Sequence, residues 1–156
     1  FNLIEAFSLL KIKNNCKLLI IGNGPLKNKL KKYVKSKNLD KKVVFIDFKS
    51  NLQRYYETAD LFVSSSKWEG FSNVIVESLS YGLSVVSTDC KSGPSEILKK
   101  GKYGDLVPIE NPKKLALAIS KNLKKKYDKK LLIKRSEDFT ISKISKKYLK
   151  EIYNER

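Results

Sequence analysis

The stretch LFVSSSKWEGFSNVIVESLSYGLSVVST, Leu61–Thr88, decides the fold class of this chain. It opens with an apolar run, Leu61–Ser64, and passes through a serine-rich loop into a helical pattern, Asn73–Tyr81. Gly82 follows, the residue type that most often ends a helix, and a second apolar run begins at once, Leu83–Ser87. A strand, a helix and a strand in this order predict two parallel strands joined by a covering helix.

The same alternation continues on both sides of this stretch. Further strands are predicted at Lys17–Ile21, Val43–Ile46 and Gly104–Val107, and further helices at Asn2–Leu10, Leu26–Lys37, Leu52–Thr58, Pro94–Lys99 and Pro112–Lys124. Two of these helices begin with proline, which is favoured at the first helical position. Caps are expected from Asn51 and from Ser72 or Asn73. The pattern predicts an α/β fold, a Rossmann-like parallel sheet with helices on both faces.

The 156 residues are enough for one compact domain, predicted over residues 1–125. A charged helical segment follows over residues 126–156. Its apolar side chains are expected to pack on the domain: Leu131, Leu132, Ile141, Ile144, Tyr148, Leu149 and Ile152. The chain begins within a helical pattern and contains no methionine, so we expect it to be part of a longer protein.

Composition excludes several kinds of chemistry. The chain has no histidine, the commonest general base and metal ligand. Its two cysteines, Cys16 and Cys90, match no metal motif and are expected to be reduced thiols in a cytoplasmic protein. No apolar run approaches the length of a membrane-spanning helix. Chemistry must therefore depend on carboxylates, hydroxyls, lysines or the substrate itself.

The net charge is +17, and only three of the 33 basic residues are arginine. Three interpretations stay open: a solvated surface, attraction to an anionic membrane, and nucleic-acid binding. A specific phosphate reader would use arginine more often, which makes nucleic acid the weakest of the three. The charge is concentrated in Lys113–Arg156, which carries 15 basic and 5 acidic residues.

Three loops follow predicted strands at their carboxyl ends, the edge where parallel sheets bind ligands. The first, Gly22-Asn23-Gly24-Pro25, could bring its backbone close to a phosphate or could be a plain tight turn. The second, Thr88–Pro94, offers Ser92 and Gly93 as donors to a ligand or as caps of the helix that Pro94 opens.

The third loop carries two carboxylates, Glu69 and Glu77, across a loop-to-helix junction. Free amides near Gly70–Val74 would form an anion site at the start of the helix. Glu77 lies in an otherwise apolar segment, where a carboxylate needs hydrogen bonds. Taken singly, both glutamates could equally be ordinary surface residues.

The order of these motifs resembles the family-four retaining glycosyltransferases of the GT-B fold. Glu69 and Glu77 match the two glutamates of the family's E-x7-E signature, and Gly70-Phe71 its usual Gly-Phe pair. The resemblance covers about residues 1–120 and includes three more segments: the glycine loop at Gly22–Pro25, Ser92–Ile97 and Gly104–Pro108.

This resemblance implies that the chain is the C-terminal, nucleotide-sugar donor-binding half of a GT-B fold, without the N-terminal acceptor domain. It implies that Glu69 acts in catalysis on the donor-sugar hydroxyls and that Glu77 binds the ribose. The remaining donor-binding residues would be Gly22, Gly24, Gly70, Phe71, Ser72, Asn73, Val74, Ser92 and Gly93. Asn51-Leu52 and Val44–Asp47 would lie near the base.

The activity implied is transfer of a sugar, with retention, from a nucleotide-diphosphate sugar, with uridine favoured. The acceptor would be a glycan or lipid-linked sugar in cell-envelope polysaccharide synthesis, on the cytoplasmic side or at the inner membrane face. No metal or other cofactor is expected, and the chain has no Asp-x-Asp motif. An arginine and a lysine that members place on the diphosphate would lie upstream of this chain, so we expect the chain alone to bind donor weakly and to be inactive.

Two other functions stay open. A GT-B-fold UDP-sugar epimerase would need acid and base residues beside the sugar ring, which the Glu69–Glu77 spacing does not suggest. A non-catalytic nucleotide-sugar or membrane-surface binding module would keep the loops without the chemistry.

Overall fold

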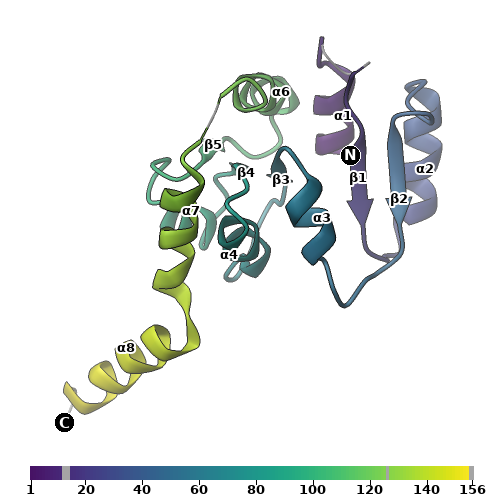
Figure 1. Ribbon diagram of the computed structural model, residues 1–156. Helices are drawn as coiled ribbons and strands as arrows, with labels where there is room; N and C mark the ends of the chain where they lie inside the picture. The colour runs from purple at the N-terminus through teal and green to yellow at the C-terminus, as the bar shows by residue number, and fades with distance from the viewer. Residues whose placement is uncertain (12–14, 126, 155–156) are drawn as a thin grey trace.

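The computed structural model describes residues 1–11, 15–125 and 127–154. Strands and helices alternate along most of the chain (Figure 1). The strands are β1 (Leu18–Ile21), β2 (Val43–Ile46), β3 (Phe62–Ser64), β4 (Val85–Thr88) and β5 (Asp105–Val107). The helices are α1 (Asn2–Ser8), α2 (Lys27–Ser36), α3 (Gln53–Thr58), α4 (Asn73–Ser80), α5 (Pro94–Ile97), α6 (Pro112–Asn122), α7 (Lys129–Ser136), η2 (Glu137–Phe139, a 3-10 turn) and α8 (Ile141–Asn154).

Every strand pairing in the described chain is parallel, as predicted. The strands form two hydrogen-bonded groups, β1-β2 and β3-β4-β5, with Leu18 opposite Val43 and Phe62 opposite Val85. The two groups share one hydrophobic core, in which Val43 and Val86 are buried together with residues of α1 and α6. The prediction of an α/β fold with parallel strands and covering helices is confirmed (Figure 1).

Strand β4 begins two residues later than the apolar run predicts, because the end of α4 uses those residues. The amide of Gly82 donates to the carbonyl of Leu79 at 2.9 Å, and the amide of Leu83 donates to Ser78 at 3.0 Å. This pair of bonds is a Schellman motif, and it requires the left-handed conformation that Gly82 adopts at φ +66°. A Cβ at Gly82 would also lie 2.9 Å from the Cβ of Lys129.

Two predicted caps differ in the structure. The residue at the N-cap of α3 is Leu52. Asn51 lies one residue earlier, and its Oδ1 accepts from the amide of Gln53 at 2.9 Å. Ser72 does occupy the N-cap of α4, but its hydroxyl makes no capping bond. At Asn51 the expected side-chain bond to an amide of the first turn is present, and the helix starts one residue later than predicted. At Ser72 the N-cap position is as predicted, but the side-chain bond is absent.

Helix α7 belongs to a second core that forms around α4. Leu132 is buried there with Ile75, Leu79, Ile97 and Leu98. The N-cap of α7 is Asp128, whose Oδ1 accepts from the amide of Lys130 at 3.0 Å. The part of the predicted C-terminal segment that reaches η2 thus packs directly on the helix that carries Glu77.

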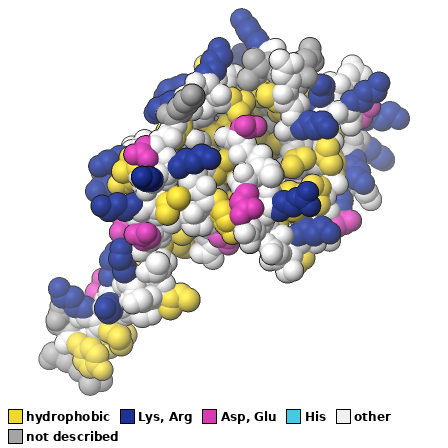
Figure 2. Space-filling model, in the orientation of Figure 1, with side chains coloured by type: hydrophobic (Ala, Val, Ile, Leu, Met, Phe, Trp, Pro, Cys, Tyr) yellow, Lys and Arg dark blue, Asp and Glu magenta, His cyan; other side chains and the backbone are white. Residues whose placement is uncertain are grey.

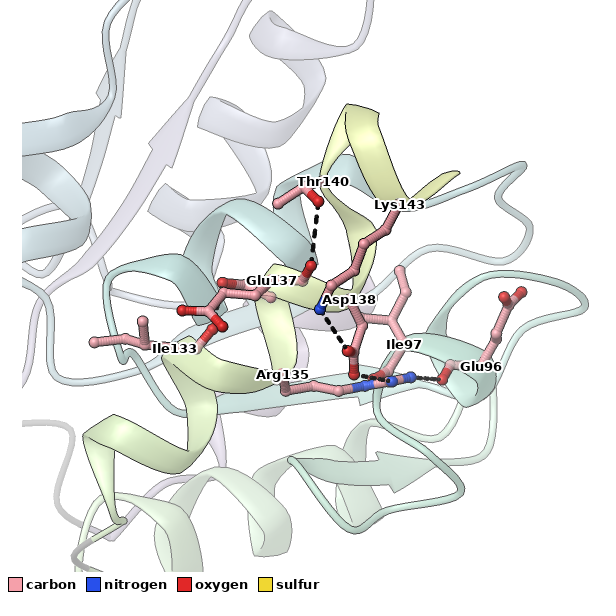
Figure 3. Close-up of polar contacts among 9 residues, drawn as sticks. Glu96, Ile97, Ile133, Arg135, Glu137, Asp138, Thr140 and Lys143 are labelled. Atoms are coloured by element: carbon pink, nitrogen blue, oxygen red, sulfur yellow. Dashed lines mark hydrogen bonds and ion pairs between the residues drawn. The ribbon is translucent and has the colours of Figure 1, made fainter. Parts of the chain in front are cut away.

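Arg135 ties α7 to α5 (Figure 3). Its guanidinium donates to the carbonyls of Ile97 at 2.8 Å and Glu96 at 2.6 Å, and it pairs with Asp138 at 2.9 Å. The guanidinium also lies over the ring of Phe139, 4.6 Å from its centroid. Carbonyls at the end of a helix lack intrahelical partners, and a partly buried cation there is favourable. The Glu96 carbonyl also accepts from the amide of Lys99 at 3.2 Å.

Helix α8 differs from the sequence prediction. Five of the seven apolar residues expected to pack on the domain are exposed: Leu131 on α7, and Ile141, Tyr148, Leu149 and Ile152 on α8. After Thr140, whose backbone is extended, the helix leads away from the rest of the molecule (Figure 1). The expected packing of this helix is therefore wrong, whereas that of Leu132 in α7 is confirmed. Among the described helices, none is long and apolar enough to cross a membrane.

Candidate functional site

The loops that follow β3 and β4 lie side by side. Trp68 in the first loop forms a parallel bridge with Lys91 in the second. Thr88, fully buried at the end of β4, donates from its hydroxyl to the backbone carbonyl of Ser66 at 2.6 Å. Because β3 and β4 are adjacent and parallel, their carboxyl ends deliver both loops to one edge of the sheet. The predicted proximity of these two loops is confirmed.

Gly93 makes the closest contact between the two loops. Its φ is +83°, and a Cβ built on it would lie 3.1 Å from the amide nitrogen of Ser72 and 3.3 Å from the carbonyl oxygen of Gly70. Any other residue would be strained in this conformation and would press on the neighbouring backbone. The structure therefore brings together Gly93, Gly70, Phe71 and Ser72, four residues that the sequence analysis selected.

Glu69 is held within its own loop. The hydroxyl of Ser66 donates to Glu69 Oε1 at 2.6 Å, and the carboxylate is partly buried. The pKa of the Cys90 thiol is raised, first by burial and then by the negative charge of the nearby Glu69. This cysteine is therefore a neutral, buried thiol beside the carboxylate, as expected for a reduced cysteine.

The first turn of α4 presents polar groups at the same edge. Ser72 is buried, and its hydroxyl has no hydrogen-bond partner within the described part of the chain. Asn73 and Val74 follow at exposed positions, where the first amides of a helix carry partial positive charge. A buried hydroxyl and free amides at a helix start are groups that an anion would satisfy.

Glu77 lies one turn further along α4, exposed to solvent. Its Oε2 accepts a hydrogen bond of 3.0 Å from the hydroxyl of Tyr56. Tyr56 is on α3, with its ring stacked on Tyr81 at 5.4 Å. The sequence analysis missed Tyr56, because a tyrosine in a short helical pattern gives no sign of a partner 21 positions away.

The glycine loop after β1 lies at the end of the other strand group. Lys27, the first residue of α2, donates from Nζ to Asn23 Oδ1 of this loop at 3.2 Å. The same Nζ lies 2.5 Å from Oδ1 of Asp47, the residue after β2. A Cβ on Gly22 or Gly24 would meet no heavy atom within 4 Å. These two glycines are open to a ligand, but the contacts that assemble the Glu69 loop do not include them.

No cluster of three or more histidine, cysteine, aspartate or glutamate side chains that could hold a metal ion occurs in the described ranges. The expectation of metal-independent chemistry stays a prediction. The groups that the edge does offer are two carboxylates, a buried hydroxyl and helix-start amides, which suit a ligand with hydroxyls and a phosphate.

Comparison with known proteins agrees with this chemistry. An uncharacterized glycosyltransferase of Methanocaldococcus jannaschii is 35% identical over 94% of this chain and 44% of its own length. A Campylobacter jejuni enzyme named N-acetylgalactosamine-N,N'-diacetylbacillosaminyl-diphospho-undecaprenol 4-alpha-N-acetylgalactosaminyltransferase is 39% identical over 70% of the chain and 29% of its own length. The chain thus spans less than half the length of these curated relatives.

A solved structure extends the likeness to three dimensions. A point mutant of Staphylococcus aureus TarM, in complex with Fondaparinux, alpha-GlcNAc-glycerol and UDP, superposes with a TM-score of 0.80. It is 28% identical, and the match covers 96% of this chain and 31% of TarM. The GT-B glycosyltransferase resemblance seen in the sequence is confirmed. The family profile described as "Glycosyl transferases group 1" matches residues 1–139, and the chain belongs to that family.

Proposed function

We propose that this chain is the donor-binding half of a retaining glycosyltransferase that uses a uridine-diphosphate sugar. The observation that carries the proposal is the assembled edge: Glu69 and Glu77 lie on either side of the α4 N-terminus, which Gly93 packs against. A nucleotide sugar presents sugar hydroxyls, a diphosphate and ribose hydroxyls in that order. The edge offers a carboxylate, helix-start amides and a second carboxylate in the same order.

The diphosphate binds at the start of α4 in this proposal. The amides of Asn73 and Val74, with the partial positive charge of the helix start, face its negative charge. The unpaired hydroxyl of Ser72 supplies a further donor. These groups also stabilise the charge that develops on the diphosphate as it leaves, which is where fixed donors accelerate a transfer.

Glu69 binds hydroxyls of the donor sugar, and Glu77 binds the ribose. Ser66 orients the first carboxylate, and Tyr56 contacts the second. The bond from the anomeric carbon to the diphosphate breaks, and a bond to the acceptor oxygen forms on the same face. The acceptor proton passes to an oxygen of the departing diphosphate, so the reaction needs no histidine and no metal.

The acceptor is a glycan or lipid-linked sugar of the cell envelope in this proposal. The support is the name of the Campylobacter relative, which refers to a diphospho-undecaprenol acceptor, and UDP as the nucleotide in the TarM complex. Acceptor recognition and full turnover are assigned to the rest of the protein, since the chain spans less than half of its relatives.

Peripheral contact with an anionic membrane completes the proposal. Lysine and arginine side chains are scattered over the visible surface, and hydrophobic side chains are exposed on α8 (Figure 2). A basic surface is attracted to anionic lipid by roughly 1 kcal/mol per lysine near the bilayer. Sedimentation with anionic vesicles, lost in high salt and absent with neutral vesicles, is the expected result. Equal binding to both kinds of vesicle would contradict it.

Calorimetric titration of the intact enzyme with nucleotides tests the donor site. UDP is expected to bind at least about tenfold more tightly than GDP, and Glu77→Ala to weaken UDP about tenfold, the loss expected when a charged hydrogen-bond partner is removed. Glu57→Ala, a change of an exposed carboxylate on α3, is the matched control and should bind normally. Unchanged UDP affinity in Glu77→Ala would overturn the assignment.

A further inference from the structure

Within the described part of the chain, the side chain of Tyr56 donates a hydrogen bond to the carboxylate of Glu77. It is only 8% exposed, although its hydroxyl reaches a carboxylate on the solvent side of α4. The ring is fixed by neighbours on two elements: Tyr81 stacks on it at 5.4 Å with an interplanar angle of 15°, and Phe62 of β3 lies 6.2 Å away. The hydroxyl is therefore presented from a rigid, buried support.

An exposed glutamate without such a partner would sample several rotamers, and binding a ligand would cost the entropy of choosing one. In this structure the hydrogen bond from Tyr56 occupies Oε2 and leaves Oε1 for another donor. Burial, followed by the charge of Glu77, raises the pKa of Tyr56 above its ordinary value of about 10. The hydroxyl thus keeps its proton, and stays a donor, throughout the neutral range.

We propose that Tyr56 is a positioning residue for ribose recognition: it holds Glu77 so that the free carboxylate oxygen meets the ribose hydroxyls. This inference rests on the proposed function, in which Glu77 binds the ribose. Tyr56 itself does not touch the nucleotide. Its effect is confined to the part of the binding energy that comes from the ribose hydroxyls.

Because only the ribose contacts depend on Tyr56 in this proposal, a positioning role can be distinguished from a purely structural one. Tyr56→Phe keeps the ring, and with it the packing against Tyr81 and Phe62, and removes only the hydroxyl. If the hydroxyl merely stabilised the fold, its loss would weaken every nucleotide equally. If it orients Glu77, the loss is felt only by nucleotides that have ribose hydroxyls to bind.

The experiment is a calorimetric cycle on the intact enzyme with two probes, UDP and 2′,3′-dideoxy-UDP. We expect Tyr56→Phe to weaken UDP by about threefold to tenfold, the value of one hydrogen bond, and to change dideoxy-UDP by less than about twofold. Tyr127→Phe is the matched control, because the Tyr127 hydroxyl also bonds a side chain, Asn122, away from Glu77. It should change neither affinity.

Equal losses for both probes, or unchanged affinity for UDP, would overturn the role of Tyr56. Glu77→Ala in the same cycle keeps this failure separate from failure of the proposed function. If Glu77→Ala weakens UDP more than dideoxy-UDP while Tyr56→Phe does not, Glu77 binds the ribose and only the inference fails. If Glu77→Ala weakens both probes equally, the ribose assignment fails as well.

Discussion

The ring of Phe71, in the loop of Glu69, packs against the ring of Phe139 in η2, with centroids 5.5 Å apart. Phe139 in turn lies under the guanidinium of Arg135, which binds the carbonyls of Glu96 and Ile97 in α5. The N-cap of α5 is Gly93, which packs against the backbone of the same loop at Gly70 and Ser72. The Glu69 loop thus packs against both η2 and the start of α5. Arg135 contacts both of these elements, through the ring of Phe139 and the carbonyls of α5.

Removing that guanidinium should destabilise the fold. Arg135→Ala breaks a bond to the carbonyl of the buried Ile97, a second bond to the carbonyl of the exposed Glu96, and one ion pair, so we expect the free energy of unfolding to fall by about 2–4 kcal/mol. Arg54→Ala is the control, because Arg54 is exposed on α3, and it should change stability by less than about 0.5 kcal/mol. Urea denaturation of both variants measures the difference. Equal free energies of unfolding for the two variants would show that the contacts of Arg135 do not stabilise the fold.

The close approach at Gly93 gives a second prediction. Gly93→Ala and Gly101→Ala both place a side chain at positive φ and should each cost about 1–2 kcal/mol of stability. Only Gly93 crowds a loop: the added Cβ lies 3.1 Å from Ser72, whereas at Gly101 the nearest atom is 3.7 Å away. We therefore expect UDP affinity to fall in Gly93→Ala alone. Calorimetry on both variants is the measurement, and equal affinities would contradict the packing argument.

The fold was predictable because its strands are continuous apolar runs and two of its helices begin with proline. Residues in the middle of elements, such as Val44 and Ile75, lie where the pattern puts them. The late start of β4 arises where one residue serves two elements. Leu83 is apolar like a strand residue, but its amide closes the Schellman motif of α4, and no hydrophobic pattern reports that bond.

The site was predictable where neighbours in sequence are also neighbours in space. Gly70, Phe71 and Ser72 are consecutive, and Gly93 was recognisable from its place before Pro94. The partners of the two glutamates were not. Tyr56 bonds Glu77 from 21 positions away, and Ser66, which bonds Glu69, is itself held through its backbone carbonyl by Thr88, 22 positions away. Such long-range contacts follow from strand order, which one sequence does not specify.

The pKa of Tyr56 gives a prediction at alkaline pH. An unfolded tyrosine loses its proton near pH 10, whereas burial raises the pKa of Tyr56 in the folded state. Above about pH 10 the unfolded state therefore binds fewer protons, and stability falls as pH rises. Tyr56→Phe removes this contribution. The free energy of unfolding of the wild type should therefore fall relative to that of the variant between about pH 9 and about pH 11. Urea denaturation across that range is the test, and a constant difference would contradict it.

The last prediction concerns Ser66 and separates sugar recognition from nucleotide recognition. Ser66→Ala removes the hydrogen bond to Glu69 Oε1 and leaves the contact of Thr88 with the backbone of residue 66 intact. If Glu69 binds only the sugar, the variant should bind UDP normally and lose about tenfold in transfer rate, the effect of about 1.4 kcal/mol on the barrier.

Ser66→Thr, which keeps a hydroxyl, should restore much of the rate. Ser80→Ala removes a comparable hydroxyl that bonds the carbonyl of Glu77, and it should change neither quantity. Steady-state transfer and UDP titration of the intact enzyme distinguish the outcomes, and a loss of UDP affinity in Ser66→Ala would mean that this loop holds the nucleotide rather than the sugar.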